Sequence, residues 1–283
     1  MMNCDCHIHM VLDGRDWKAA IAGHASCPDE ALICQRLTQY QLDGYRYLRD
    51  GGDRWGVGKR ARELAPEYGI RYRTPLSPIC HAGHYGGFIG EKYENLQEYA
   101  ALVRKMRAQG ADFIKIMISG LMDFDRFGVL SEVGLPAGEI RELIHIAHEE
   151  GFAVMAHANG ARTVETAAAA GVDSVEHGAY LDLDALQAMA ENGTVWVPTL
   201  SAIANLRGKG RFQEEAVCAI FRSAGENLRQ FADLGGLIAC GSDAGAWAVP
   251  HGCNTELAHV RQVLGNSADA ILAKGNQTIM EKF

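Results

Sequence analysis

The chain has 283 residues, of which 48% are hydrophobic and 22% are charged, and this ordinary globular composition excludes a disordered polypeptide. Its formal net charge of −8 argues against a protein that binds nucleic acid or an anionic membrane through a basic face. The sequence contains neither an apolar run of the roughly 18 residues that a membrane span needs nor a recognisable secretory signal. We therefore expect a cytoplasmic protein that acts on a small molecule, and the sequence leaves homo-oligomer formation open.

The first expected strand, residues 3–9, contains the letters DCHIH. Cys4, Cys6, His7 and His9 are all metal-ligand types, so a local Cys2His2 zinc site is one interpretation. Side chains two positions apart share a face of a strand, which groups the histidines with Asp5 and turns the cysteines the other way. We therefore expect the histidines to face the interior as catalytic metal ligands and the cysteines to pack as apolar residues against the helical layer.

Segments rich in Val, Ile and Tyr recur along the chain and alternate with helical patterns that end at glycine. The expected strands are residues 3–9, 45–48, 70–75, 112–118, 152–157, 173–177, 194–198 and 237–242, and helical patterns between them include 135–151, 160–171, 181–193 and 211–236. Alternation of strand and helix implies parallel pairing. Eight such units in about 250 residues predict an α/β fold of the (β/α)8 TIM-barrel type, with a doubly wound sheet as the alternative.

The chain lacks a linker rich in Pro, Gly or Ser, so we expect one barrel domain over residues 1–283. Two segments that follow expected strands are unusually long, residues 10–27 and 80–91. Long loops of this kind usually build the substrate pocket of a barrel.

Six polar side chains stand at or near the C-terminal ends of five expected strands. They are His7 and His9 on the first, Lys115 on the fourth, His157 on the fifth, His177 on the sixth and Asp243 after the eighth. Each alone has a structural explanation, such as a hydrogen-bonded histidine or a helix-capping aspartate. Their recurrence at the end of the strands where barrel active sites form favours metal-dependent catalysis.

At these six positions the sequence resembles the amidohydrolase superfamily of metal-dependent hydrolases. The surrounding text "VMAHANG", "VDSVEHGAYLD", "VWVPT" and "GSDAG" is most similar to the branch of Xaa-Pro dipeptidases and carboxypeptidases. Many members of that branch carry a flanking β-sandwich, and we expect this chain to lack it because its first strand starts at Asn3.

The resemblance implies two divalent metal ions, with zinc as the expected metal. The two histidines of the first strand and Asp243 would hold the more buried ion, and His157 and His177 would hold the second. Lys115 would bridge both ions as a carbamate formed with carbon dioxide. A lysine ammonium has no lone pair for a metal, but burial near cations lowers the lysine pKa and favours the neutral amine that adds carbon dioxide.

The activity implied is hydrolysis of an amide (C–N) bond in a small substrate, such as a dipeptide or an N-acyl amino acid, by a metal-bound hydroxide. Asp243 would take the proton from the hydroxide and pass it to the leaving group. A lactonase, phosphoesterase or cyclic-amide hydrolase remains an alternative, because the metals do not choose the substrate. A metal-binding barrel without turnover is the other alternative, although it would not need Asp243 to carry a proton.

Candidate substrate contacts lie on the expected loops at the same end of the barrel. His84 in "AGHYGG" and His251 in "AVPHG" are the candidate substrate-binding residues. The segment "RGKGR", which holds Arg207, Lys209 and Arg211, follows the seventh expected strand. Its pattern favours a solvated loop over a receptor for a substrate carboxylate.

Overall fold

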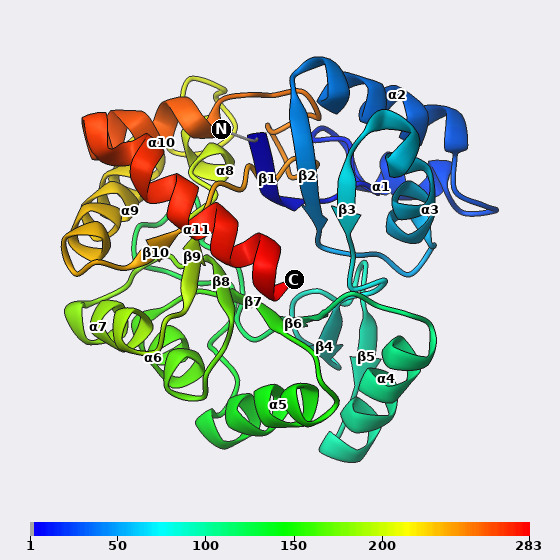
Figure 1. The fold of residues 1–283 in the computed structure, drawn as a ribbon. Coiled ribbons are helices and arrows are strands. Elements are labelled where there is room, and N and C mark those ends of the chain that lie inside the picture. Colours follow the sequence, from blue (N-terminus) through cyan, green and yellow to red (C-terminus); the bar gives the residue numbers. More distant parts are fainter. Residues whose placement is uncertain (1–2) are drawn as a thin grey trace.

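Parallel strands form the centre of the molecule and helices surround them in the computed structural model, which describes residues 3–283 (Figure 1). The strands are β1 (Asn3–Ile8), β2 (Tyr45–Asp50), β3 (Arg71–Arg73), β4 (Ile79–His81), β5 (Glu91–Tyr93), β6 (Ile114–Met117), β7 (Val154–Ala158), β8 (Ser174–His177), β9 (Val195–Val197) and β10 (Leu237–Ile238). They pair in parallel as two runs, β1-β2-β3 and β10-β9-β8-β7-β6-β4-β5. A strand is therefore present at each of the eight expected segments.

Two backbone contacts join these runs into a closed barrel. Cys6 N donates to Cys240 O at 2.8 Å, which joins β1 to the segment after β10. Asp112 N donates to Thr74 O at 3.0 Å, which joins the end of β3 to the start of β6. β3 and β4 together fill one barrel position, and β5 pairs with the other edge of β4. The predicted eight-position barrel is confirmed, and an open doubly wound sheet is excluded.

Helices surround the barrel on its outside, and the last of them crosses one of its ends (Figure 1). They are α1 (Trp17–Gly23), α2 (Glu30–Leu42), α3 (Val57–Leu64), α4 (Leu96–Ala108), α5 (Ala137–Glu149), α6 (Ala161–Ala169), α7 (Leu183–Glu191), α8 (Ser201–Ala204), α9 (Glu214–Asp233), α10 (Glu256–Leu264) and α11 (Ala268–Lys282), with 3-10 turns η1 (Ala65–Tyr68) and η2 (Gly265–Ser267). Several begin at a capping residue, because the side chains of Asp29, Asn95 and Asp182 accept hydrogen bonds from the first turns of α2, α4 and α7.

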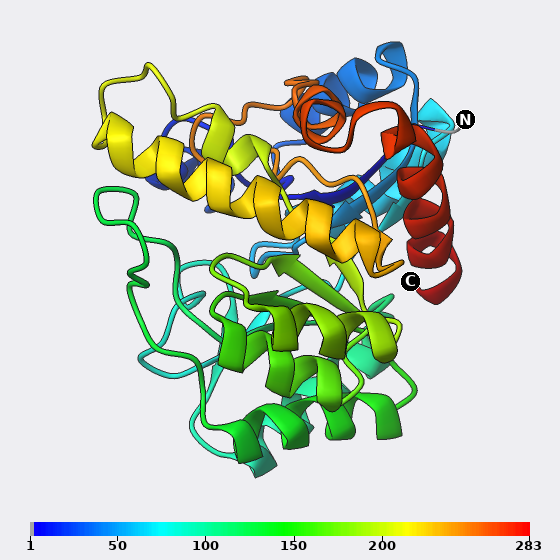
Figure 2. The same ribbon diagram turned by 90° about the vertical axis from the view of Figure 1, so that its left-hand side faces the viewer.

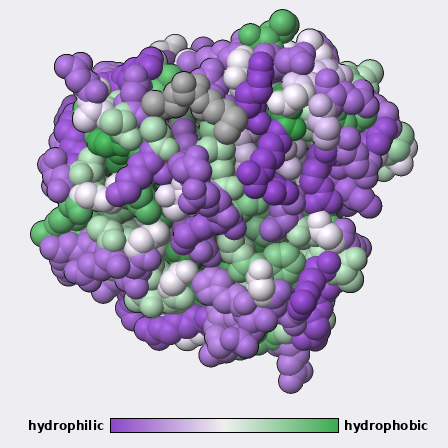
Figure 3. All heavy atoms as spheres, in the orientation of Figure 1, coloured by the Kyte–Doolittle hydropathy of each residue, from purple (hydrophilic) through white to green (hydrophobic). Residues whose placement is uncertain are grey.

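The two ends of the barrel differ. Figure 2 places α11 at one end, and the long loops after β6 and around residues 205–213 extend from the other. On the face that α11 crosses, hydrophilic residues cover most of the outer helices and hydrophobic ones lie mainly between them (Figure 3). No helix in residues 3–283 has the length and apolar character needed to cross a membrane.

The cysteines of β1 contact a helix, but not one of the outer ring. Cys4 Sγ is 3.8 Å from Met280 Sδ and Cys6 Sγ is 3.8 Å from Asn276 Oδ1, both on α11. They belong to a buried cluster in which strand residues such as Tyr47 meet the C-terminal end of the chain. The pairing of β1 with β2 is irregular between Asp5 and Ile8, so strict alternation does not hold along this strand. The predicted contact with the helical layer is therefore corrected to the helix that covers one end of the barrel.

Candidate metal centre

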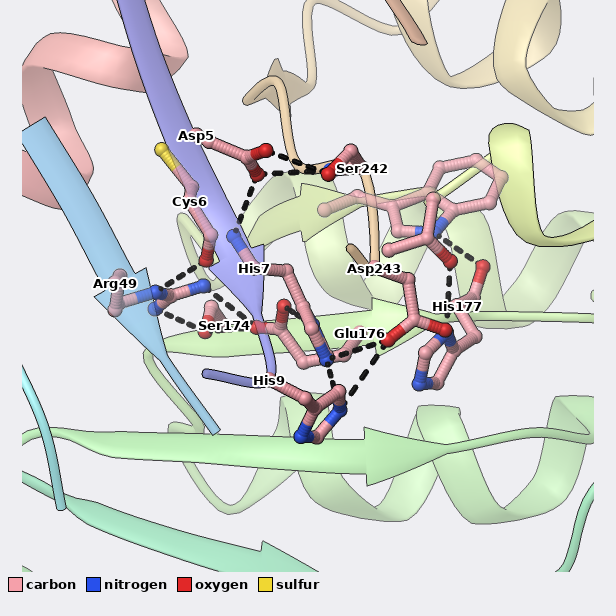
Figure 4. Close-up of polar contacts among 12 residues, drawn as sticks. Asp5, Cys6, His7, His9, Arg49, Ser174, Glu176, His177, Ser242 and Asp243 are labelled. Carbon is pink, nitrogen blue, oxygen red and sulfur yellow. Dashed lines mark hydrogen bonds and ion pairs between the residues drawn. The ribbon is translucent and has the colours of Figure 1, made fainter. Parts of the chain in front are cut away.

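Three buried side chains converge where β1 meets the segment after β10 (Figure 4). His7 Nε2 lies 3.3 Å from His9 Nε2, and Asp243 Oδ1 lies 3.4 Å from His7 Nε2 and 3.2 Å from His9 Nε2. These three residues form a group that could hold a metal ion. Neither Cys4 nor Cys6 belongs to that group, so the local Cys2His2 interpretation is set aside.

The "GSDAG" segment is held against β1 by paired contacts. The Asp5 carboxylate accepts from Ser242 N at 2.8 Å and from Ser242 Oγ at 2.5 Å, and also from His7 N at 3.3 Å. Asp5 therefore contacts the segment after β10 and the backbone of β1. Asp243 N donates to His7 O at 2.8 Å. A Cβ at Gly241 would lie 2.8 Å from the Cβ of His7, so glycine permits this close approach.

An ion-paired network fixes the ring of His7 from behind. His7 Nδ1 lies 2.6 Å from Glu176 Oε2, and Glu176 Oε1 accepts from Arg49 Nη2 at 2.8 Å and from Ser174 Oγ at 2.6 Å. His7, Arg49 and Glu176 are fully buried. Burial lowers the pKa of His7 well below its usual value, so the ring is neutral. Its Nδ1 proton is donated to the carboxylate, which leaves the Nε2 lone pair toward His9 and Asp243.

Sequence reasoning missed Glu176 and Arg49. Glu176 directly precedes His177, and strict alternation would turn the two side chains to opposite faces. His177 has a φ of 68°, in the left-handed region, so the strand geometry changes at that residue. A buried strand that contains an arginine, "YRYLRD", was the available signal, because a fully buried arginine needs a carboxylate partner.

Lys115, His157 and His177 lie beside the three-residue group. The ring centroid of His177 is 4.6 Å from that of His157 and 5.0 Å from that of His7. Burial lowers the pKa of His157 to about 3, and it lowers the pKa of His177 well below its usual value. His157 Nε2 donates to Gly120 O at 3.2 Å, so its Nδ1 keeps a lone pair for another ligand.

Lys115 is 1% exposed, and its Nζ is buried without a hydrogen-bond partner among the described residues. Burial lowers its pKa to about 8, so roughly a tenth of the amine is neutral at pH 7. Asp243 Oδ1 and His9 Nδ1 also lack a hydrogen-bond partner in residues 3–283. Buried polar atoms are almost always paired, so this concentration of unpaired atoms fits a site that holds metal ions.

A cavity of about 580 Å³ opens over these side chains and is lined by all six predicted metal-site residues. Its wall contains neither His84 nor His251. The ring of His251 lies instead 2.9 Å from Tyr40 Oη and 3.0 Å from Leu12 O, so both of its nitrogens are engaged. His84 Nδ1 lies 3.4 Å from a carboxylate oxygen of Glu132. The structure thus brings the predicted metal ligands together but not the two predicted substrate contacts.

Comparison with known proteins agrees with this geometry. The model described as the amidohydrolase family matches residues 58–273. Ochratoxinase from Aspergillus niger is 28% identical over 153 residues, which is 50% of this chain and 28% of that enzyme. The match therefore spans little more than a quarter of the length of this curated relative.

Solved structures share the barrel over almost the whole chain. A Xaa-Pro dipeptidase with bound methionine aligns with a TM-score of 0.79 and 23% identity over 99% of this chain and 75% of its own. The A. niger ochratoxinase structure aligns with a TM-score of 0.80 and 20% identity over 97% of this chain and 70% of its own. A putative prolidase from Bifidobacterium longum aligns with a TM-score of 0.76 and 22% identity over 98% of this chain and 69% of its own. At these identities the likeness establishes the fold.

Proposed function

The chain belongs to the amidohydrolase family, and on that premise we propose that it is a metal-dependent hydrolase that cleaves the amide bond of a small substrate, such as a dipeptide or an N-acyl amino acid. The observation that carries the proposal is the convergence of His7, His9 and Asp243 at 3.2–3.4 Å in a buried site at the base of a large cavity. The dipeptidase and ochratoxinase relatives support an amide as the bond cleaved.

Two divalent ions, with zinc as the proposed metal, are the cofactors of this reaction. The two histidines of β1 and Asp243 would hold one ion, and His157 and His177 would hold the other. When bound, the ions would polarise the scissile carbonyl and increase the acidity of a nearby water molecule.

Lys115 would connect the two halves of the site. Its Nζ lies buried and unpartnered. The neutral amine can add carbon dioxide with loss of a proton, and the resulting carbamate would offer one oxygen to each ion. This modification also gives the buried nitrogen a chemical role that an ammonium in the same place would lack.

Asp243 is the proposed proton carrier, because Oδ1 is buried and has no hydrogen-bond donor in the described part of the chain. It would accept a proton as the water oxygen bonds to the carbonyl carbon, and then deliver it to the nitrogen as the C–N bond breaks. The products are a carboxylate and an amine. A cytoplasmic location remains part of the proposal, supported by cysteines that form no disulfide among residues 3–283.

The test is turnover of a panel that contains dipeptides, N-acyl amino acids, lactones and phosphoesters, with protein reconstituted with zinc and bicarbonate. We expect hydrolysis of amides, and Asp243→Asn should lower kcat by about 10²–10⁴ while most of the metal stays bound. Asp269→Asn, a matched change on the surface of α11, should have the wild-type rate.

Three results would count against the proposal. Cleavage confined to lactones or phosphoesters would replace the amide assignment. Metal binding without turnover of any class would favour a non-catalytic barrel. A wild-type kcat in Asp243→Asn would remove this residue as the proton carrier.

A further inference from the structure

Aromatic side chains from separate segments line the cavity above the candidate metal centre. Their rings contact one another across these segments, at centroid distances of 5.3 Å for Trp17 with Phe88, 5.3 Å for Phe124 with Phe212, and 6.0 Å for Phe212 with Trp247. Aliphatic residues such as Leu12, Met117, Leu121, Met122 and Leu206 fill the wall between them. Such a wall binds flat apolar groups, and the volume lies within the range of about 300–1,000 Å³ found for drug-sized ligands.

Two arginines line the same wall, Arg15 and Arg211, and Arg211 is the one that stacks on aromatic rings of the cavity. Its guanidinium carbon lies 4.2 Å from the ring centre of Trp247 and 5.4 Å from that of Phe212. Within residues 3–283 it has no carboxylate partner. Stacking on the rings limits the freedom of the side chain and leaves its N–H groups for a ligand oxygen.

The acids of the lining do not offer a matching site for a cation. Asp243 belongs to the metal centre, and Asp123 is already paired with Arg126 at 2.6 Å. A free dipeptide carries an ammonium group, and placing it against the apolar wall would remove its hydration without a partner. An N-acyl group at that position carries no charge and avoids this cost.

From these contacts we propose that the substrate is an N-acyl amino acid with an aromatic acyl group, whose carboxylate binds Arg211 and whose rings bind the aromatic wall. This inference rests on the proposed amide hydrolysis and names its substrate class. Arg211 is then a specificity-determining residue, because a charge-assisted bond to a carboxylate is stronger than one to a neutral amide.

The same loop provides a matched control. Arg207 stands four positions earlier in "RGKGR", but its guanidinium lies 4.4 Å from the ring centre of Phe221, and its Nε donates to Ala204 O at 3.1 Å. It lines a separate depression with Cys218 and not the central cavity. Arg207→Ala therefore removes the same charge from the same segment without changing the proposed carboxylate site.

The experiment compares kcat/KM for N-(2-naphthoyl)glycine, N-(2-naphthoyl)glycinamide and N-acetylglycine in wild type, Arg211→Ala and Arg207→Ala. Wild type should prefer the naphthoyl acid over its carboxamide by about 10–100-fold, the size of a hydrogen bond to a charged group. It should also prefer naphthoyl over acetyl. Arg211→Ala should lose the preference for the acid, so that the ratio of kcat/KM for the acid to that for the carboxamide falls toward one, and Arg207→Ala should match wild type. Retention of the preference in Arg211→Ala, or equal rates for naphthoyl and acetyl acids, would overturn the proposal.

Binding of the same acid and carboxamide by calorimetry separates this inference from the proposed function. If neither compound is hydrolysed but the acid binds wild type at least about 10-fold more tightly than it binds Arg211→Ala, the carboxylate site stands and the assigned reaction fails. If the acid binds both proteins equally, the carboxylate site is refuted whatever the turnover.

Discussion

At the scale of single residues, the candidate site depends on buried groups that hold one another in place. Glu176 stands between Arg49 and His7, with contacts of 2.8 Å and 2.6 Å. A carboxylate that accepts the Nδ1 proton of a histidine fixes both the tautomer and the orientation of the ring. Glu176 is therefore a positioning residue for His7. The positive charge of Arg49 compensates the buried negative charge of Glu176.

Glu176→Gln should weaken zinc binding by about 10–100-fold, because the neutral amide is a weaker acceptor and leaves Arg49 without its counter-charge. Competition with a chromophoric chelator measures the affinity. Nitrogen chemical shifts of His7 in the metal-free protein report the tautomer directly, and they should show a mixture in the variant.

Ser174→Ala is the control for that experiment, because Ser174 also contacts Glu176 but not His7. It should keep both the affinity and the tautomer. An unchanged zinc affinity in folded Glu176→Gln would show that the metal site does not depend on this carboxylate.

The sequence predicted the residues whose position in a strand determines their direction. His7, Lys115 and His157 follow from the ends of barrel strands, and the cavity contains them all. His84 and His251 were chosen because they lie on loops, where sequence does not determine direction, and neither lines the cavity. Glu176 could not be found in this way, because its direction depends on the left-handed φ of His177, and the amino-acid sequence does not indicate that backbone conformation.

At the scale of elements, β1 separates two kinds of side chain within a few residues. Cys6 is fully buried and Cys4 is 4% exposed, in a cluster that joins the barrel to α11. The histidines that follow lie in the candidate metal centre. The irregular pairing between Asp5 and Ile8 lets this one strand serve both environments.

Replacing Cys4 and Cys6 together with alanine should lower the free energy of unfolding by about 1–2 kcal/mol through lost packing. Zinc content should stay at the wild-type level, because neither sulfur belongs to the metal-binding group. Urea unfolding and elemental analysis of the double variant test both statements. His9→Ala is the contrasting variant and should lose metal, whereas metal loss in a folded cysteine variant would contradict the separation.

A buried carboxylate joins α10 to the turn after β9. Glu256 accepts from Leu200 N at 2.9 Å and from Ser201 N at 2.6 Å, and it is 3% exposed. Burial raises its pKa from 4.5 to about 7. The folded state therefore binds the proton on the Glu256 carboxyl group more tightly than the unfolded state does. Protonated Glu256 stabilises the fold fully below pH 4.5, and this contribution to the free energy of unfolding is lost as the pH rises through about 7.

Glu256→Gln should remove this pH dependence, because the amide does not titrate. Between about pH 4.5 and pH 8, the free energy of unfolding of wild type should fall relative to that of the variant by up to roughly 3 kcal/mol. Urea unfolding of chelator-treated proteins at several pH values measures the difference. Parallel pH profiles for the two proteins would contradict the role given to Glu256.

The elements that the sequence missed are short and have long-range partners. β4 and β5 have three residues each, and they lie where a long loop was expected to start and end. Their backbone partners are set by the neighbouring β6 and by each other, which local composition does not encode. The eight barrel strands were found because each is followed by a helical pattern, and that alternation is a property of the whole chain.

At the scale of the molecule, the two ends of the barrel have different roles, because packing covers one end and the candidate site lies at the other. α11 covers one end, while the loops at the other end surround the cavity and carry its aromatic wall (Figure 2). Barrels generally place catalysis at the C-terminal ends of their strands, and the candidate metal centre lies there. Substitutions in the loops should therefore change specificity with little effect on the fold, as the Arg211→Ala experiment requires.

The metal content of the purified protein tests the central claim most directly. Elemental analysis of protein prepared without chelators, and again after reconstitution with zinc and bicarbonate, should give about two divalent ions per chain, because six side chains of ligand type line one cavity. Lys115→Ala should lower this value, since it removes the proposed bridge. A reproducible value of about one or fewer in the reconstituted wild-type protein would contradict the two-metal account.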